Sequence, residues 1–245
     1  AISRHGVGYD NVDLNFIKKN NISLLITATA NAVAVAEHVL SMFLSLSKSI
    51  SSYDAEVRKG NFKSNADKIQ TFELFKKNIL IAGFGRIGKK LISRCLAFDT
   101  NVYIYDPYVD EKIIKKFGGI KVDKIEDGLK KADYVSLHMP LTNETKNLIN
   151  YSILKTMKKN SIIINTARGG IINELELEKA LNEGLIFGAA LDVFSKEPVE
   201  KDNPLLKNKK VILSPHSATF TDECTSRMGI ETTKNIIDFF ENKID

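Results

Sequence analysis

Short apolar runs alternate with longer helical segments from Asn78 to Leu213, and this alternation constrains the fold more than any other feature of the sequence. The runs have the length of strands and are apolar throughout, not only at every second residue. Such strands, separated by helices, are typical of a parallel sheet that helices cover on both faces. The predicted strands are 79–82, 102–105, 134–138, 162–165, 187–192 and 211–213, and the predicted helices are 86–98, 110–117 and 173–183. We therefore expect an α/β fold with a doubly wound parallel sheet.

The segments outside this region are less regular. Residues 22–27 form an apolar run of strand length, and residues 32–47 indicate a long helix that is apolar nearly all round. A helix of that kind is buried, in the core or in a contact between subunits. Residues 49–77 are polar and predict a connecting arm, whereas residues 221–241 predict a closing helix.

A glycine-rich loop joins the strand 79–82 to the helix that follows it. The loop reads Gly83-Phe84-Gly85-Arg86-Ile87-Gly88. In a dinucleotide-binding loop, Gly83 would make the tight turn, Gly85 would let the backbone approach a pyrophosphate, and Gly88 would allow close packing of helix on strand. The same glycines could form an ordinary turn, but the strand before them and the helix after them favour the phosphate loop.

An acidic residue ends the next predicted strand. Asp106 lies 18 residues after Gly88 and is followed by Pro107, without an adjacent arginine. A carboxylate at this position accepts hydrogen bonds from the ribose hydroxyls of NAD and repels the 2′-phosphate of NADP. The sequence therefore predicts dinucleotide binding, with NAD favoured over NADP.

Three residues with catalytic potential follow three different predicted strands. Arg168 follows the strand 162–165, Glu197 follows 187–192, and His216 follows 211–213. Each alone would be an ordinary surface residue, but the carboxyl ends of parallel strands meet where such sheets bind their ligands. Together they supply a bidentate anchor for a carboxylate and an acid/base pair. A glutamate beside His216 would favour the imidazolium and keep a proton available near neutral pH.

The other histidines carry weaker predictions. His138 ends the strand 134–138 and could line the cofactor cleft, whereas His38 lies within a predicted helix and is expected to be a packed or capped core histidine. His5 has no assigned role.

Composition excludes several other classes of protein. The net charge is +5 and the lysines are scattered without interleaved aromatics, which disfavours a nucleic-acid surface. Cys95 and Cys224 form no metal-binding pattern and are expected to be free thiols, so we predict no metal. The most apolar stretch, residues 32–46, is interrupted by charge and too short to span a bilayer, and no signal peptide is visible. These features favour a cytoplasmic protein with no membrane partner.

Three blocks of the sequence resemble the D-isomer-specific 2-hydroxyacid dehydrogenases. They are the glycine loop with Asp106, the run from Met157 through Arg168 to Phe194, and Glu197-Pro198 with Ser214-Pro215-His216. The resemblance extends over essentially the whole chain, and the later two blocks are more specific than the first. Phosphoglycerate-dehydrogenase-like and hydroxypyruvate- or glyoxylate-reductase-like members are the most similar, and the choice among them stays open.

The resemblance implies a role for each candidate residue. Arg168 would bind the carboxylate and keto oxygen of a small 2-oxo acid, His216 would exchange the proton, and Glu197 would orient His216. The backbone N–H groups of Val7 and Gly8 would also bind the substrate. The residues implied in NAD binding are Gly83, Gly85, Arg86, Ile87, Gly88, Asp106, His138, Met139, Pro140, Thr145, Thr166, Ala167, Asp192, His216 and Ala218.

The resemblance also implies a domain organisation. Residues 31–218 correspond to the NAD-binding Rossmann domain, and residues 1–30 with 219–245 correspond to a remnant of a flavodoxin-like substrate domain. The helix and arm 32–75 would form a homodimer. Most of the N-terminal substrate domain is missing from the sequence, so we expect either a piece of a longer protein or a degenerate product without a working lid.

Two other functions fit the same residues. One is an NAD(H)-binding regulatory or scaffold module of the same fold, similar to transcriptional corepressors, which would bind NADH without turnover. The other is a formate dehydrogenase, which is disfavoured because that relative pairs its histidine with glutamine, whereas this chain has Glu197.

Overall fold

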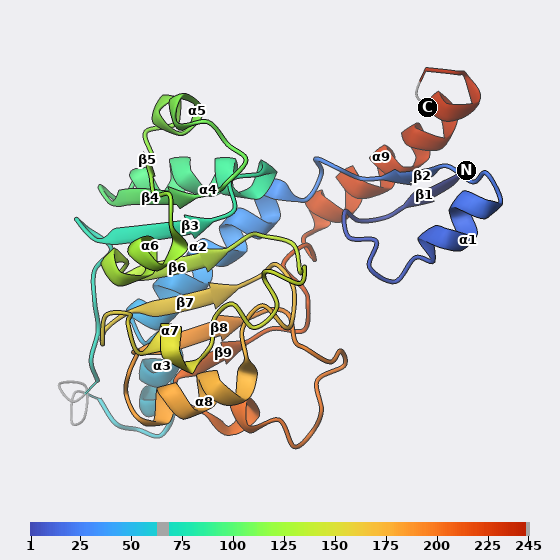
Figure 1. Cartoon of the computed structure of the whole chain (residues 1–245). Helices are drawn as coiled ribbons and strands as arrows, with labels where there is room; N and C mark the ends of the chain where they lie inside the picture. The colour runs from blue at the N-terminus through green and yellow to red at the C-terminus, as the bar shows by residue number, and fades with distance from the viewer. Residues whose placement is uncertain (63–68, 244–245) are drawn as a thin grey trace. The chain divides into compact units, whose positions relative to one another are not determined.

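The computed structural model describes residues 1–62 and 69–243, and the chain divides into two compact units. Unit 1 comprises Ala1–Val35 and Ala218–Asp245, and unit 2 comprises Ala36–Ser217. Unit 2 contains a seven-stranded sheet, and unit 1 contains a two-stranded sheet (Figure 1).

The sheet of unit 2 is parallel throughout, in the order β5-β4-β3-β6-β7-β8-β9. The first strand of this sheet, β3, lies near its middle. The strands β4 and β5 extend the sheet to one edge, and β6 to β9 extend it from β3 to the other edge. The strands are β3 (Asn78–Ala82), β4 (Asn101–Tyr105), β5 (Ile120–Lys121), β6 (Tyr134–Leu137), β7 (Ile162–Asn165), β8 (Gly188–Leu191) and β9 (Val211–Leu213). This order confirms the predicted doubly wound α/β fold, with a switch point between β3 and β6.

Helices connect the strands and cover both faces of this sheet. The connecting helices are α4 (Arg86–Leu96), α5 (Glu111–Lys116), α6 (Ile125–Lys131), α7 (Tyr151–Leu154), α8 (Glu174–Asn182) and a 3₁₀ helix (Pro204–Lys207). Most of α2 (Ala32–Ser47) also packs on the sheet, and α3 (Ile50–Arg58) follows α2 before the first strand. Side-chain oxygens cap several of them; the Asn173 amide oxygen, for example, accepts a hydrogen bond from Glu176 N–H at the start of α8.

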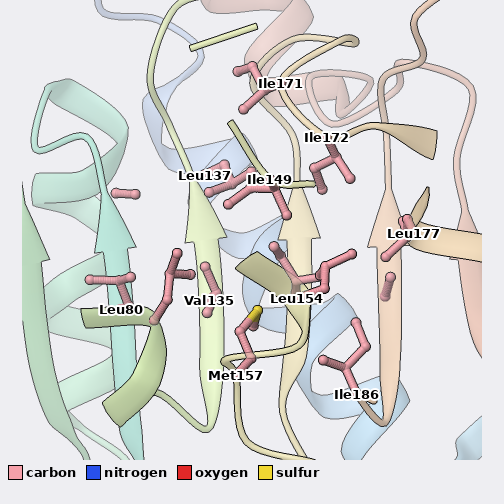
Figure 2. Packing of buried hydrophobic residues seen from close by; sticks show 14 of the residues in the cluster. Leu80, Val135, Leu137, Ile149, Leu154, Met157, Ile171, Ile172, Leu177 and Ile186 are labelled. Carbon is pink, nitrogen blue, oxygen red and sulfur yellow. The ribbon is translucent and has the colours of Figure 1, made fainter. Parts of the chain in front are cut away.

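Alternate residues of each strand enter two separate cores. Ile79 and Ile81 pack with α2, α4 and α5 on one face, whereas Leu80 and Ala82 pack with α6, α7 and α8 on the other. Figure 2 shows the second core, where Leu80 lies among labelled side chains of β6, α7 and α8. Successive side chains of a strand point to opposite faces, so strands buried on both sides must be apolar throughout.

Unit 1 is built from two short parallel strands and two helices. The strands β1 (Ile2–Arg4) and β2 (Leu24–Ile26) pair in register, α1 (Leu14–Lys19) connects them, and α9 (Asp222–Phe240) contacts both strands. The buried cluster of this unit is small, consisting of Ala30, Ala34, Cys224 and Met228.

Several predicted boundaries differ from the structure. The helix predicted over 86–98 ends at Leu96, and the closing helix covers 222–240. The predicted arm contains α3, which buries no side chain and therefore has no apolar stripe to identify it; residues 63–68 of the arm lie outside the described residues. The elements α1, α6, α7 and β5 were not predicted, because seven residues or fewer give only a weak hydrophobic period; α5 is equally short but was included in the predicted helix 110–117.

Within the described residues, no single helix is long and apolar enough to cross a membrane. Only α2 and α3 taken together meet that test, and they are bent by 57°. The same part of the chain contains no group of three or more His, Cys, Asp and Glu side chains that could hold a metal ion.

Candidate functional site

The candidate residues of unit 2 lie in loops that leave the carboxyl ends of adjacent strands. The loop after β3 begins at Gly83 and the loop after β6 begins at His138, on the two sides of the switch point. The loops after β7, β8 and β9 begin at Thr166, Asp192 and Ser214. In sheets of this order, ligands bind in the crevice outside these strand ends.

The glycine loop has the geometry that the spacing predicted. Gly83 has a φ of +100°, and a β-carbon there would lie 2.7 Å from the carbonyl carbon of His138. A β-carbon on Gly88 would lie 2.6 Å from the carbonyl oxygen of Gly83. Both positions therefore require glycine, the first for a left-handed turn and the second for close packing of α4 on the loop.

Open space lies beside the backbone of Gly85. A β-carbon on this exposed residue would meet none of the described residues within 4 Å, so a ligand can approach the backbone here. Gly85 is also the N-cap of α4 and has no side-chain cap, so the N–H groups of Arg86 and Ile87 begin the helix. Such a helix start attracts phosphate, because its N–H groups and positive dipole end face the ligand.

Asp106 holds the glycine loop from the end of β4. Its Oδ2 accepts a hydrogen bond from Phe84 N–H at 2.7 Å, and its Oδ1 accepts one from Tyr108 N–H at 2.9 Å. A carboxylate has about four lone-pair positions, so acceptor capacity remains for the hydroxyls of a ribose. The residues around β3 and β4 therefore fit a dinucleotide without a 2′-phosphate.

His138 is a neutral histidine at the end of β6. Its Nε2 lies 2.8 Å from Ser136 Oγ, and its buried Nδ1 has no hydrogen-bond partner among the described residues. Burial lowers the pKa of His138 to about 4, because the imidazolium would lose its hydration. Further along this loop, Thr145 Oγ1 donates to the carbonyl oxygen of Pro140 at 2.7 Å, which holds the loop in a turn.

Arg168 lies in a turn that the buried Asn165 side chain organises. Asn165 Oδ1 accepts from Ala167 N–H at 3.0 Å, and Asn165 Nδ2 donates to the carbonyl oxygen of Arg168 at 2.8 Å. Thr166 Oγ1 is buried in this turn, and within the part of the chain that the structure describes it has no hydrogen-bond partner. The half-buried guanidinium of Arg168 donates to the carbonyl oxygen of Ala167 at 2.7 Å.

The structure brings His216 and Glu197 together. His216 Nδ1 lies 2.8 Å from Glu197 Oε2, and Glu197 Oε1 accepts from Phe194 N–H at 3.0 Å. Because a carboxylate only accepts, His216 carries a proton on Nδ1, and its Nε2 is the nitrogen left for a ligand. The His216 side chain is 54% exposed, so a ligand can reach it.

Buried Asp192 holds the backbone on both sides of His216. Its Oδ1 accepts from Ser214 Oγ at 2.5 Å and from Ser217 N–H at 2.8 Å, and its carbonyl oxygen accepts from His216 N–H at 2.8 Å. His38 Nε2 lies 3.1 Å from Ser214 Oγ. The histidine predicted to be packed or capped is thus hydrogen-bonded, with a ring that is partly exposed and not fully in the core.

Glu174 is a second residue that the sequence reading missed. Its Oε1 accepts from the N–H and the hydroxyl of Ser195, at 2.6 and 2.7 Å, and its Oε2 accepts from Asn203 Nδ2 at 2.7 Å. These bonds fix the loop that carries Glu197 against the start of α8. A carboxylate in the first turn of a helix is a common capping feature, so the sequence offered no signal for this contact.

Unit 2 thus contains Arg168, Glu197 and His216 in loops that follow three adjacent strands, with the glycine loop across the switch point. Val7, Gly8 and Ala218 belong to unit 1, and their predicted roles stay predictions. Gly6 is tied to Thr27 by two hydrogen bonds, which hold the start of the Val7–Gly8 loop beside the end of β2.

The parallel sheet, its switch point and the glycine loop define a Rossmann dinucleotide-binding domain. The sequence assigns the domain further: the NAD-binding domain of the D-isomer specific 2-hydroxyacid dehydrogenases matches residues 40–218. The chain belongs to this family, and NAD is the cofactor of its domain.

Two curated relatives show the extent of the match. D-3-phosphoglycerate dehydrogenase of Methanocaldococcus jannaschii is 37% identical over 236 residues, which are 96% of this chain and 44% of that protein. Glyoxylate reductase of Korarchaeum cryptofilum is 34% identical over 99% of this chain and 74% of its own length. The chain thus spans less than half the length of the first relative and about three quarters of the second.

Solved structures agree with this assignment. A formate dehydrogenase from Granulicella has a TM-score of 0.92 and 25% identity, covering 98% of this chain and 64% of that chain. D-lactate dehydrogenase from Aquifex aeolicus, solved with NAD and lactic acid, has a TM-score of 0.88 and 32% identity, covering 98% and 76%.

Proposed function

We propose that the protein is an NAD-dependent dehydrogenase that interconverts a small 2-oxo acid and the D-2-hydroxy acid. The observation that carries the proposal is the 2.8 Å contact between His216 Nδ1 and Glu197 Oε2. These residues follow β9 and β8, and Arg168 follows the adjacent strand β7. An acid/base pair beside a bidentate anion anchor at the strand ends of a Rossmann domain suits reduction of a keto group next to a carboxylate. The relatives named for glyoxylate and lactate support this substrate class.

The proposed mechanism assigns one task to each side chain. Arg168 binds the carboxylate and keto oxygen of the substrate with its planar guanidinium. The chemistry that NADH supplies when bound is a hydride for the keto carbon. His216 donates a proton from Nε2 to the keto oxygen, so that the carbonyl becomes a hydroxyl. Glu197 fixes the ring and stabilises the imidazolium before the proton leaves; in the reverse direction His216 accepts the proton.

The remaining predicted residues would hold the cofactor. Gly85, Arg86 and Ile87 would meet the pyrophosphate, in a loop whose shape depends on Gly83 and Gly88. Asp106 would bind the adenosine ribose. His138, Met139, Pro140 and Thr145 would line the adenosine side, and Thr166, Ala167, Asp192 and Ala218 the nicotinamide side. The unpartnered polar atoms of His138 and Thr166 support this assignment, because buried polar groups normally have partners.

We further propose that residues 1–30 and 219–245 belong to the substrate domain, with 31–218 as the NAD-binding domain. In this arrangement the backbone N–H groups of Val7 and Gly8 bind the substrate carboxylate. Support comes from the division of the chain into two units and from the pairing of β1 with β2. The small buried cluster of unit 1 agrees with a domain that is only partly present in these residues.

The proposed dimer uses the helix and arm 32–75. From Ala36 on, α2 packs in the core of unit 2, and Ala34 packs in the cluster of unit 1, so its apolar character alone does not require a partner. The arm, in contrast, exposes Ile50 by 53%, Val57 by 56% and Phe62 by 76%. A second copy would cover these side chains. Sedimentation equilibrium should report a dimer, and the Val57→Asp variant should shift it toward monomer; a monomeric wild type would contradict the proposal.

The function is tested by NADH oxidation with glyoxylate, hydroxypyruvate and pyruvate, after the intact mass of the purified protein has been measured. His216→Ala and Arg168→Ala should each lower kcat/KM at least about a hundredfold while NADH still binds. Lys115→Ala, in an exposed ion pair with Glu111 on α5, is the control and should keep the wild-type rate. Unchanged turnover in either site variant would refute the assignment.

The same assay separates the alternatives. NADH binding without reduction of any 2-oxo acid would point to the regulatory or scaffold module. Oxidation of formate in place of 2-hydroxy acids would point to a formate dehydrogenase, which Glu197 disfavours.

A further inference from the structure

We propose that His38 is a positioning residue that acts on His216 through Ser214 and Asp192. The inference rests on the proposed function, in which His216 is the acid/base of the reaction. It concerns a residue on helix α2, 178 positions before His216 in the sequence. The contacts that carry it all lie within unit 2.

His216 needs support because its backbone is in an unfavourable conformation. Its φ is +53°, in the left-handed region that residues with a β-carbon rarely adopt. Such conformations persist only where surrounding contacts hold them, and they concentrate at functional sites. The orientation of the imidazole therefore depends on whatever fixes residues 214–217.

The contacts that fix this loop converge on Asp192. Ser214 Oγ and Ser217 N–H both donate to Asp192 Oδ1, and His216 N–H donates to the carbonyl oxygen of Asp192. Asp192 itself is 1% exposed at the end of β8 and so has a defined position. Of these three hydrogen bonds, only the one from Ser214 is donated by a side chain. It therefore depends on the rotamer of Ser214.

The proton of the Ser214 hydroxyl determines what His38 must do. A hydroxyl has one proton to donate, and Ser214 directs it to Asp192 at 2.5 Å, because a carboxylate can only accept. The same oxygen can then only accept from His38 Nε2 at 3.1 Å. His38 must therefore carry a proton on Nε2, and its N–H fixes the rotamer in which Ser214 donates to Asp192.

The alternative is that His38 merely fills space beside β9. The ring is 25% exposed, and Nε2 lies 3.8 Å from Asp192 Oδ1. A space-filling ring would require no particular nitrogen to carry a proton, and an apolar residue of similar volume would replace it. The two interpretations therefore differ in whether an N–H donor at this position is needed.

Two substitutions at one position separate these interpretations. His38→Gln keeps an N–H donor at a similar reach, whereas His38→Leu keeps volume without a donor. We expect His38→Leu to lower kcat about fivefold, the size of one hydrogen bond, with little change in the Kd for NADH. His38→Gln should retain at least about half of the wild-type kcat. Glu37→Gln, next to His38 on α2, is the control: it removes a surface ion pair with Arg94 of α4 and should leave kcat unchanged.

A double-mutant cycle tests the route through Ser214. If His38 acts through this hydroxyl, His38→Leu combined with Ser214→Ala should reduce kcat no further than Ser214→Ala alone. Multiplying losses, or equal rates in His38→Leu and wild type, would overturn the proposal. A fall in melting temperature with an unchanged kcat would also overturn it and leave a structural role only.

Nitrogen-15 NMR of the histidine rings makes the test independent of turnover. His38 should carry a proton on Nε2, and the amide of Ser217 should exchange faster in His38→Leu than in wild type or His38→Gln. An unprotonated Nε2, or equal exchange in all three proteins, would refute the role of His38. If the wild type reduces no 2-oxo acid but these signatures are present, the proposed function fails while the positioning of the loop stands.

Discussion

Gly169 lies so close to the carbonyl group of Phe194 that a β-carbon built on it would come within 1.8 Å of the carbonyl oxygen. The contact joins the turn that carries Arg168 to the segment that leads to Glu197. Both partners are backbone, so neither can rotate out of the way. The close approach of these two segments therefore requires a residue without a β-carbon at position 169.

Gly169→Ala should consequently damage both stability and turnover. We expect a loss of roughly 1–3 kcal/mol in the free energy of unfolding, because the added atom must displace backbone. The kcat for a 2-oxo acid should fall more than the affinity for NADH. Gly229→Ala, in α9 with nothing within 4 Å of the added atom, should be neutral or slightly stabilising. Denaturant unfolding and steady-state kinetics check both variants. A Gly169→Ala protein with the stability and kcat of the wild type would contradict the expectation.

The glycine loop gives a pair of variants with opposite expected effects. Gly85→Ala places a methyl group in open space beside the proposed pyrophosphate, so it should keep the melting temperature and raise the Kd for NADH at least about tenfold. Gly88→Ala meets the Gly83 carbonyl oxygen at 2.6 Å and should lower stability instead. Calorimetric titration and thermal unfolding measure the two effects. A Gly85→Ala protein that binds NADH normally would refute the proposed pyrophosphate site at Gly85.

Asp106 should determine the choice between the two nicotinamide cofactors. Asp106→Ser removes the negative charge that repels a 2′-phosphate, so the ratio of affinities for NADH and NADPH should fall by about tenfold or more. The loop should stay folded, since a hydroxyl can still accept from Phe84 N–H, which the carboxylate contacts now. Asp110→Ser, at the N-cap of α5, is the matched control and should leave the ratio unchanged. An unchanged ratio in Asp106→Ser would place the ribose elsewhere.

Glu197→Gln tests the charge in the His216 pair. Glu197 accepts from both His216 Nδ1 and Phe194 N–H, and a glutamine has one oxygen to offer to these two donors. One contact is therefore lost together with the charge that stabilises the imidazolium. We expect kcat to fall about tenfold to a hundredfold with NADH affinity retained. A kcat equal to wild type would show that the carboxylate is dispensable.

His138 should make stability depend on pH in a defined window. Its pKa in the folded protein is about 4, against 6.5 in the unfolded chain, so the unfolded state binds more protons between these values. The contribution is complete above about pH 6.5 and is lost as the pH falls toward 4, in total on the order of 3 kcal/mol. His138→Leu should flatten this slope, whereas exposed His5→Gln should not. Urea unfolding at several pH values tests this, and equal slopes in wild type and His138→Leu would contradict it.

Much of the fold could be predicted because its causes are local. Strands buried on both faces must be apolar over their whole length, and the glycines of a phosphate loop must keep a fixed spacing from one strand and one helix. Asp106 followed from the same spacing.

The contacts that support the candidate site could not be predicted in this way. His38 bonds to a residue 176 positions away and Glu174 to one 21 positions away, and no periodic pattern records such pairs. The short elements α6, α7 and β5 were missed for a related reason, since packing against the sheet stabilises them more than their own sequence does.

The register of the sheet has a further consequence. The last residues of β7, β8 and β9, which are Asn165, Leu191 and Leu213, are paired across the sheet. The loops that contain Arg168, Glu197 and His216 therefore begin at the same height along the strands. An insertion or deletion inside one loop lengthens that loop without moving the points where the others begin. Selection for a new substrate can therefore act on a few loop residues while the buried strands, and the stability that they provide, remain unchanged.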